Sequence, residues 1–349
     1  MKRIILKCRP GARFHLGKSV SDVSLQLSDT SEYIHSDTLF SALINALAKA
    51  LPDKVNQLVE AFESDKVKIS SAFYCLEPKG KGLDWVYFLP IPVVFPNLAG
   101  SNYKAAKKIK FISEKLVHFG LPVGQCLDHP DVVIVNNAFM CLKSELDFLD
   151  DKEKAILKIY KKISEPKVKA RTETKMDALF ERTDIHLENH PHLIHRVHCH
   201  FWFGLEIKDS DIETLFQTAL NLLVDEGIGG ERSVGCGMIE GYEDNVGWEF
   251  PQSGDTGLFL NLSLVIPSSE HEFRQFHGYH ILKRGGRRLP KSNAGQKDRY
   301  LQQVQMVKEG AVLMSVISGK KENLFKGEDN TPKYRYGKCF SYPVPKNFL

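Results

Sequence analysis

The most constraining feature of the sequence is one continuous segment, residues 194–242, which predicts a strand, a helix, a glycine-rich loop and a second strand in that order. Apolar side chains alternate along residues 194–207, which is the period of a strand. Ser210 and Glu213 have the spacing of a capping box, so a helix is expected to begin there, and Gly227 suits its end. The apolar stripe of that helix consists of Ile212, Leu215, Phe216, Ala219, Leu222 and Leu223. The segment therefore predicts one strand–helix–strand unit.

A second unit of the same kind is expected at the N-terminus. Residues 3–9 alternate as a strand, a helix is expected between Ser36 and Pro52, and residues 67–75 follow as a strand. A long insertion separates the two units, with helices expected at 104–119 and 150–163. This order fits an α+β fold with a split βαβ, ferredoxin-like sheet. The first domain is expected at residues 1–245, with an interdomain connection at 243–257 and a smaller second domain at 258–349.

Composition supports a globular protein and excludes several classes. The 349 residues suit two domains, and 42% apolar with 26% charged residues is globular composition. The net charge of +4 is too small by itself to indicate a polyanionic partner. No stretch approaches the roughly 20 apolar residues that a membrane helix needs. The seven scattered cysteines include no CxxC pair, which indicates a reduced, cytoplasmic protein with free thiols.

The glycine loop, residues 227–237, has five glycines in eleven residues. Glycine permits positive φ and close approach of backbone to a ligand, and exposed amides can cradle phosphate. Arg232 and Ser233 add a guanidinium fork and a hydroxyl. The loop is no P-loop, because it lacks Gly-Lys-Ser/Thr, and no dinucleotide fingerprint, because a helix precedes it and a strand follows. A plain helix-to-strand turn is the alternative interpretation.

A glycine-rich loop between the last helix and last strand of a ferredoxin-like domain resembles the RAMP proteins of CRISPR systems. Residues 34–43, which contain His35-Ser36-Asp37-Thr38-Leu39-Phe40, follow the segment 11–17 and resemble the N-terminal motif of subunit four of the type III-A Csm complex. Residues 279–286 resemble that subunit's second-domain hairpin, and the segment 336–338 extends the match toward the C-terminus. The sequence does not separate this subunit from its counterpart in type III-B Cmr complexes.

The resemblance implies two tandem ferredoxin-like domains in a non-catalytic, RNA-binding subunit without a cofactor. Such a subunit holds the repeat-derived 5′ tag of the CRISPR RNA, docks the large cyclase and nuclease subunit, and caps a backbone of sibling RAMP subunits. Its thumb-like hairpin reaches the target RNA near the first guide–target pairs. The residues expected to hold the tag are Gly227, Gly229, Gly230, Arg232, Ser233, Gly235 and Gly237, with Arg13 and His35 in the motifs nearest that loop.

Two basic segments are further candidates for RNA contact. Residues 166–193 are the expected thumb, whose candidate contacts to the RNA backbone are Lys169, Arg171, Thr172, Lys175 and Arg182. The second segment surrounds a Gly-Gly pair at 285–286 that is expected as a hairpin tip. Its candidate phosphate clamp consists of Lys283, Arg284, Arg287 and Arg288. A solvated surface hairpin and a solubilising turn are the respective alternatives.

Histidines raise two further interpretations. Six of the thirteen lie between residues 186 and 200, yet no second Cys/His pair has zinc spacing, so no metal site is expected. Arg196, His198 and His200 are instead expected on an exposed strand face, which either stacks on bases and meets phosphates or is a plain solvated face. His15, beside Arg13, leaves open a stand-alone, metal-independent endoribonuclease that processes precursor CRISPR RNA. The sequence contains no GxSxG, HExxH or Gly-Gly-Asp-Asp motif.

Overall fold

The computed structural model describes residues 1–17, 29–169, 178–187, 191–246, 248, 256–287, 300–324 and 333–349. One mixed sheet, antiparallel except at the β6–β8 pair, organises the N-terminal part of the chain. Its central strands are β1 (Lys2–Lys7), β4 (Phe73–Pro78), β11 (Val197–Ile207) and β12 (Gly241–Val246). They lie in the order β12-β1-β11-β4, and β3 (Val67–Ile69) also pairs with β11.

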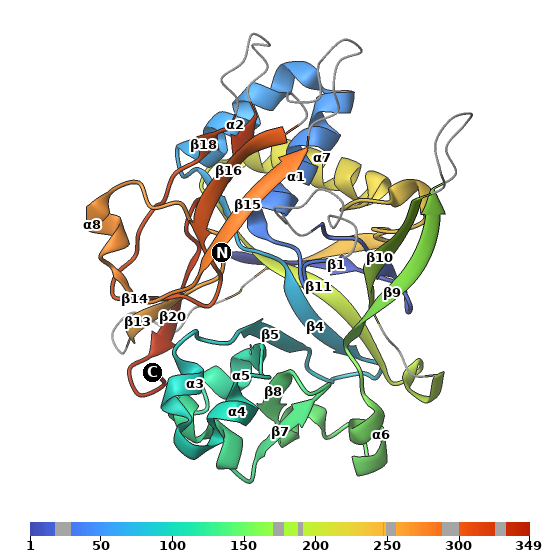
Figure 1. Cartoon of the computed structure of the whole chain (residues 1–349), viewed down its shortest axis with the longest axis vertical. Coiled ribbons are helices and arrows are strands. Elements are labelled where there is room, and N and C mark those ends of the chain that lie inside the picture. The colour runs from blue at the N-terminus through green and yellow to red at the C-terminus, as the bar shows by residue number, and fades with distance from the viewer. Residues whose placement is uncertain are drawn as a thin grey trace.

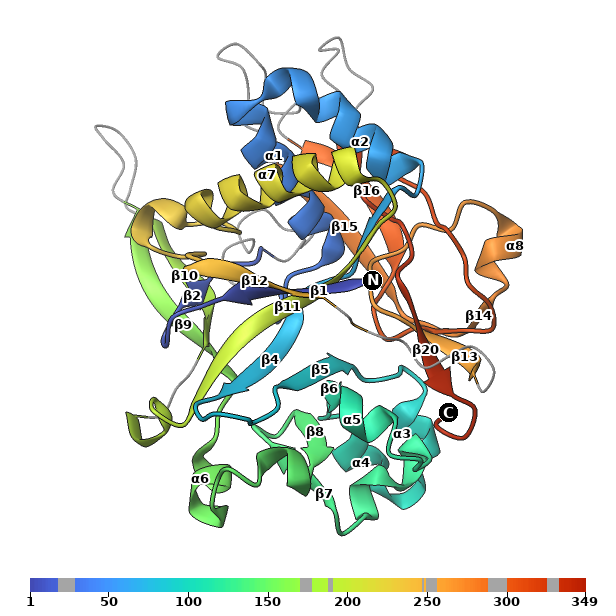
Figure 2. The ribbon, with the colours of Figure 1, turned by 180° about the vertical axis from the view of Figure 1, so that it is seen from behind.

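Two helices make the crossovers of this sheet. Helix α1 (Ser36–Ala50) follows β1, and α7 (Ser210–Glu226) connects β11 to β12. With α2 (Val55–Glu63), they lie on the same side of the strands, at the top of Figures 1 and 2. The N-cap of α7 is Asp209, one residue before the predicted Ser210. Its carboxylate accepts hydrogen bonds from backbone amides in the first turn of the helix.

Both faces of β11 are covered, which the alternating pattern does not predict. Trp202 and Phe203 point to opposite faces, and both are 0% exposed. Trp202 packs edge-to-face on Trp248, with 5.2 Å between ring centroids. The exposed face predicted for residues 196–200 is therefore wrong at His200, which is 2% exposed and packs beside the ring of Trp85.

The insertion extends the sheet beyond β4. The added strands follow in the order β5 (Val86–Pro90), β6 (Phe111–Ser113), β8 (Phe139–Leu142) and β7 (Val132–Val135). Around them, at the bottom of Figure 1, lie α3 (Phe95–Leu98), α4 (Tyr103–Ala106), α5 (Glu114–Val117) and α6 (Asp151–Ile156). The single helix predicted at 104–119 is wrong. Phe111 and Ile112 instead pair with β5 and β8, so strand pairing overrides the helical period.

A long hairpin stands beside the sheet where the sequence predicts the thumb (Figure 1). Strand β9 (Tyr160–Lys169) pairs antiparallel with β10 (Ala178–Leu187), and Lys169 lies opposite Ala178. At its root, β2 (Arg13–Phe14) pairs with β10. The helix predicted at 150–163 is wrong beyond Ile156, because β9 begins at Tyr160.

The C-terminal part has a second antiparallel sheet. Its strands are β13 (Thr256–Asn261), β14 (Phe276–Gly278), β17 (Val312–Leu313) and β20 (Ser341–Pro345), in the order β14-β17-β13-β20. The short helix α8 (Glu270–Phe273) follows β13. Two ribbons complete this part, β15 (Ile281–Arg287) with β16 (Tyr300–Val307) and β18 (Glu322–Asn323) with β19 (Tyr334–Arg335). The tight turn predicted at residues 285–286 is wrong, because both glycines lie inside β15 at a register irregularity.

One apolar core joins the N-terminal and C-terminal parts. Tyr336 stacks on Phe40 with 5.3 Å between ring centroids, and its hydroxyl accepts from the Ile69 amide at 3.1 Å. A Cβ at Gly204 would lie 2.6 Å from the Phe340 ring, so a larger residue would push the two parts apart. All seven cysteines are buried and free. Among the described residues, no helix combines the length and apolar character needed to cross a bilayer.

Candidate nucleic-acid interface

The glycine loop begins where α7 ends. Gly227 has φ 74°, and its N–H donates to the carbonyl of Leu223 at 2.8 Å, which confirms the predicted cap. The next amide, Ile228, donates to the carbonyl of Gly237 at 2.9 Å. The loop is therefore closed at its base by its own backbone, and its middle residues project as a tip.

Close backbone packing explains several of the glycines. Gly237 has φ 79°, and a Cβ there would lie 2.0 Å from the carbonyl oxygen of Ile228. Gly229 has φ 94°, and its Cβ would lie 2.5 Å from the carbonyl oxygen of His15. No side chain fits at these distances. These two glycines allow the loop to fold against itself and against the segment 13–15.

The tip of the loop carries the free amides. Glu231 is left-handed with φ 57°, and a 3₁₀ turn follows at Arg232–Val234, whose side chains are exposed. The amides of Val234 and Gly235 donate back to Glu231 and Arg232 at 3.2 and 3.0 Å. Within the described ranges, the amides of Glu231, Arg232 and Ser233 donate to no protein acceptor. Three successive N–H groups at the start of a helical turn can bind an anion.

A buried polar cluster supports the tip from below. The Arg182 guanidinium lies 3.0 Å from the Asp184 carboxylate and 3.6 Å from that of Glu231. His15 Nδ1 lies 3.0 Å from the Thr183 carbonyl and 3.2 Å from Asp184. Burial alone would raise the pKa of Asp184, but the His15 hydrogen bond and the Arg182 charge lower it. Arg182 and His15 are 7% and 4% exposed, so they connect the hairpin to the loop inside the protein.

Two further arginines belong to this region, Arg13 at the base of the loop and Arg232 in its tip. The Arg13 carbonyl accepts from the Gly237 amide at 2.6 Å, and its half-buried side chain has no acceptor among the residues that the structure describes. Arg232 is exposed and pairs with Glu226 at 3.2 Å. An exposed ion pair of this kind is weak and is easily exchanged for a phosphate. Of the predicted contacts, the structure thus gathers Arg13, Arg182, Arg232, Ser233 and the five glycines at one place.

The remaining candidates belong to two other segments of the chain, 169–175 and 283–288. Lys169 ends β9, and the predicted contacts Arg171, Thr172 and Lys175 lie outside the described residues. Lys283 is exposed on β15. Arg287 is the last residue of β15, and Arg288 lies outside the described residues.

His35 lies at the junction between the N-terminal and C-terminal parts. Its Nδ1 is 2.8 Å from Glu309 Oε1, and the Tyr33 hydroxyl donates to Oε2 at 3.0 Å. The Ser71 hydroxyl donates to the same carboxylate. Burial alone would raise the pKa of Glu309, but His35 and the Ser71 hydrogen bond lower it. Glu309, in the C-terminal part, is thus bonded to three groups of the N-terminal part.

Asp37, two residues later, makes the second link of this junction. Arg284 donates from Nε and Nη2 to its two oxygens at 2.9 Å each, and Arg335 donates from Nη1 at 2.6 Å. Asp37 is 0% exposed. Burial alone would raise the pKa of Asp37, but the two guanidiniums hold it well below its usual range. We call His35, Asp37, Arg284, Glu309 and Arg335 the junction cluster.

The junction cluster changes the interpretation of the predicted site. The sequence predicts His35 near the glycine loop and Arg284 in a separate phosphate clamp, whereas in the structure both side chains are buried and bonded to carboxylates. Sequence reasoning missed Glu309 and Arg335. The sequence around them carries no clear signal, because Glu309 follows another charged residue, Lys308, and a buried pair of distant charges leaves no local pattern.

Glu77, His198 and His200 hold potential metal-ligand atoms within 4.8 Å of one another. Burial lowers the pKa of His200 to about 4, so its imidazole is neutral. The Glu77 carboxylate, however, already pairs with the ammonium groups of Lys7 at 3.1 Å and Lys79 at 2.6 Å. Two neighbouring ammonium groups disfavour a divalent cation. The cluster is better explained as an ion-pair network on the sheet.

Comparison with known proteins agrees with the resemblance carried by the motifs. Residues 255–344 match the model of the CRISPR Csm4 C-terminal domain. A curated protein of Methanocaldococcus jannaschii, named CRISPR system Cms protein Csm4, is 25% identical over 265 residues. That match covers 70% of this chain and 66% of the relative, just under two thirds of its length.

Solved structures share the fold over nearly the whole chain. Crystal structures of a Csm1–Csm4 cassette in complex with cA4 and with cA3 each contain a chain that matches with a TM-score of 0.55. The alignments cover 99% of this chain and 98% of the matched chain, at 17% and 18% identity. The α+β architecture described above is therefore shared with these chains.

Proposed function

We propose that this chain, a Csm4-like RAMP subunit of a type III CRISPR complex, is the RNA-binding subunit that holds the repeat-derived 5′ tag of the CRISPR RNA in a type III-A assembly. Its role is to bind and position RNA, without a catalytic step. Phosphates of the tag lie on the tip of the glycine loop, and unstacked bases are read at their edges, as is usual for single-stranded RNA.

The observation that carries this proposal is the geometry of the tip. Three successive free amides at residues 231–233 form an anion-binding turn. The exposed Arg232 adds positive charge in the tip, and the half-buried Arg13 contacts the base of the loop through its carbonyl. The base of the loop is fixed by the Gly230 amide, which donates to the His15 carbonyl at 2.8 Å. A fixed turn binds phosphate without first losing backbone freedom, which favours affinity.

The proposal extends to the architecture and the partners. The strand orders β12-β1-β11-β4 and β14-β17-β13-β20 support two tandem ferredoxin-like domains, at residues 1–245 and 258–349. The β9–β10 hairpin is the thumb that reaches the target RNA near the first guide–target pairs. The matched structures pair Csm4 with Csm1, and we assign this chain a large cyclase and nuclease subunit and sibling RAMP subunits as partners.

The test is RNA binding by an Arg13→Ala/Arg232→Ala variant. Binding of a labelled single-stranded repeat RNA is measured by filter binding at several salt concentrations. Each lost phosphate contact lowers the slope of log K against log salt by about 0.7, so the double variant should lose about 1.4. The matched control is Lys54→Ala/Lys152→Ala, which removes two exposed charges distant from the loop in sequence and should keep the slope.

Two outcomes oppose the proposal. An unchanged salt slope in the Arg13→Ala/Arg232→Ala variant would show that the tip holds no phosphate. Cleavage of labelled repeat RNA by the purified chain in EDTA, lost on His15→Ala, would favour the stand-alone endoribonuclease. We expect no cleavage, because His15 is buried and its Nδ1 lies within 3.0 Å of the Thr183 carbonyl.

A further inference from the structure

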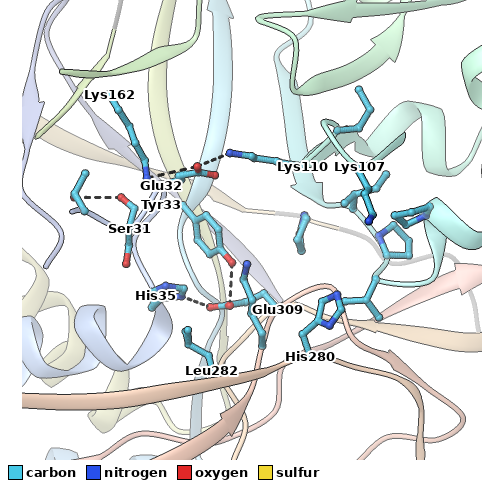
Figure 3. Close-up of a pocket in the computed structure, with 18 of the residues that line it drawn as sticks. Ser31, Glu32, Tyr33, His35, Lys107, Lys110, Lys162, His280, Leu282 and Glu309 are labelled. Carbon is cyan, nitrogen blue, oxygen red and sulfur yellow. Dashed lines mark hydrogen bonds and ion pairs between the residues drawn. The ribbon is translucent and has the colours of Figure 1, made fainter. Parts of the chain in front are cut away.

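A second basic site lies away from the glycine loop. A pocket of about 610 Å³ opens where the segment before α1, the insertion and the C-terminal part meet. Figure 3 shows Lys107 and His280 on one side of it and Ser31 and Lys162 on the other. No residue of the glycine loop lines it. The volume lies within the range of small-molecule sites, which is roughly 300–1,000 Å³.

The acidic groups of this pocket are already neutralised. Glu32 pairs with Lys110 and with Lys162, the latter at 3.6 Å. Burial alone would raise the pKa of Glu32, but these lysines lower it, so the carboxylate stays ionised and paired. Glu309 is bonded to His35, Tyr33 and Ser71 as described above. Neither carboxylate is left to attract a cation or to repel an anion strongly.

Two lysines of the pocket form no direct ion pair among the described residues, although the charge of Lys308 contributes to the lowered pKa of Glu32. Lys107 and Lys308 both line it, and within the part of the chain that the structure describes neither forms an ion pair. Lys107 holds its ammonium 4.5 Å from the centre of the Tyr103 ring, a cation–π contact. Exposed His280 lines the same cavity. The pocket therefore presents unpaired positive charge to an incoming ligand.

The wall beside Lys107 is apolar and includes an aromatic ring. It is formed by Pro90, Ile91, Pro92 and Val93, with Tyr103 38% exposed at the rim. Flat apolar and aromatic surfaces bind a nucleobase by stacking. Such a surface accepts any of the bases, because every base has a π-face. An apolar and aromatic surface next to unpaired ammonium groups can bind both the base and the phosphate of a nucleotide.

We infer that this pocket binds one nucleoside phosphate, with the phosphate on Lys107 and Lys308 and the base against Tyr103 and the proline wall. The ligand is either a free nucleotide or one unstacked nucleotide of a bound RNA, because both present the same chemistry. The site is additional to the glycine loop, so the inference does not need the tag to lie on that loop.

The test compares a Lys107→Ala/Lys308→Ala variant with the Lys54→Ala/Lys152→Ala control. AMP, CMP, inorganic phosphate and a short single-stranded RNA are titrated against each by calorimetry. We expect the pocket variant, but not the control, to bind the nucleotide or the RNA at least about tenfold more weakly. Tyr103→Leu should weaken the same ligand by about fivefold or more, since loss of one stacked base costs that much. Thermal unfolding of each variant checks that it is folded.

The probes separate the two sources of ligand. Lysine-dependent AMP binding identifies a free nucleotide. Lysine-dependent binding of RNA alone, with photocrosslinking of 4-thiouridine RNA to the peptide that contains Tyr103, identifies an RNA nucleotide. Equal binding of AMP and inorganic phosphate, unaffected by Tyr103→Leu, overturns the inference, and so does unchanged binding in the pocket variant. Arg13→Ala/Arg232→Ala leaves AMP binding intact, so a failure of the glycine-loop proposal is recognised separately.

Discussion

Individual glycines of the loop differ in what they do, although the sequence presents them as equals. Gly235 has φ 86° and open space around its Cβ position, whereas Gly237 has φ 79° and the Ile228 carbonyl 2.0 Å away. The composition of the loop predicts positive φ but not which carbonyl lies opposite. That information depends on how the loop folds back on itself and on the segment 13–15, which no local pattern encodes.

Gly237→Ala and Gly235→Ala are therefore a matched pair. Gly235→Ala should cost about 1–2 kcal/mol, the strain of a left-handed residue with a side chain. Gly237→Ala carries the same strain and must also displace the Ile228 backbone, so we expect a loss of at least about 3 kcal/mol. Urea unfolding of both variants measures the difference. Equal losses would show that the loop base relaxes freely and is not fixed as described.

At the scale of elements, the start of α1 is the most informative case. The sequence predicts this helix, and the structure confirms it at Ser36–Ala50. The role of its first turn was not predictable from the same residues. Asp37 bonds to Arg284 and Arg335, which are 247 and 298 residues away along the chain. Local periodicity detects a helix, but it contains no information about partners at that distance.

Asp37→Asn should destabilise the protein strongly. It leaves two buried guanidiniums without a counter-charge, a change that costs about 3–5 kcal/mol. The control is Arg274→Ala, which removes an exposed pair with Glu270 and should cost less than about 1 kcal/mol. Chemical unfolding at pH 7 measures both. A loss for Asp37→Asn no larger than that of the control would contradict the importance of the junction cluster.

The effect of Asp37→Asn on stability depends on pH, because the Asp37 carboxylate titrates. The folded pKa of Asp37 is depressed, so its stabilisation is fully present above the ordinary aspartate range near 4 and is lost as pH falls through the depressed value. Asn does not titrate. The difference in unfolding free energy between the parent and Asp37→Asn should therefore shrink progressively in acid.

The secondary-structure predictions are wrong at segments whose conformation is determined by pairing with a distant strand. Residues 104–119 have helical spacing, yet Phe111 and Ile112 belong to a strand between β5 and β8. Residues 285–286 have the composition of a tight turn, yet β15 runs through them. In both cases a neighbouring strand supplies hydrogen bonds that a single-segment pattern does not represent. The β9–β10 hairpin, whose pairing is local, overlaps the predicted thumb segment 166–193 but begins at Tyr160, inside the predicted helix 150–163.

For the whole molecule, the sequence predicts two successive sheets, but it does not predict that their apolar residues form one common core. Tyr336 stacks on Phe40, and Gly204 has the rings of Phe340 and Trp248 directly above it. These contacts make one apolar core of the N-terminal and C-terminal parts. Composition and length suggest two domains, and neither property reports whether their apolar faces are packed against each other.

The shared core predicts a single unfolding transition for the whole chain. Tryptophan fluorescence, which reports on Trp85 and on Trp202 and Trp248 at the contact, and far-ultraviolet circular dichroism should give the same midpoint in urea. The physical reason is that either part alone exposes the apolar surface that the other covers. Two separated transitions would show that the parts are stable independently.

The junction cluster also limits how this chain can change over generations. One carboxylate serves two guanidiniums that come from β15 and β19, so its loss leaves both arginines without their shared partner. A change at Asp37 is therefore tolerated only together with changes at Arg284 and Arg335. We expect these three positions to change together among related chains.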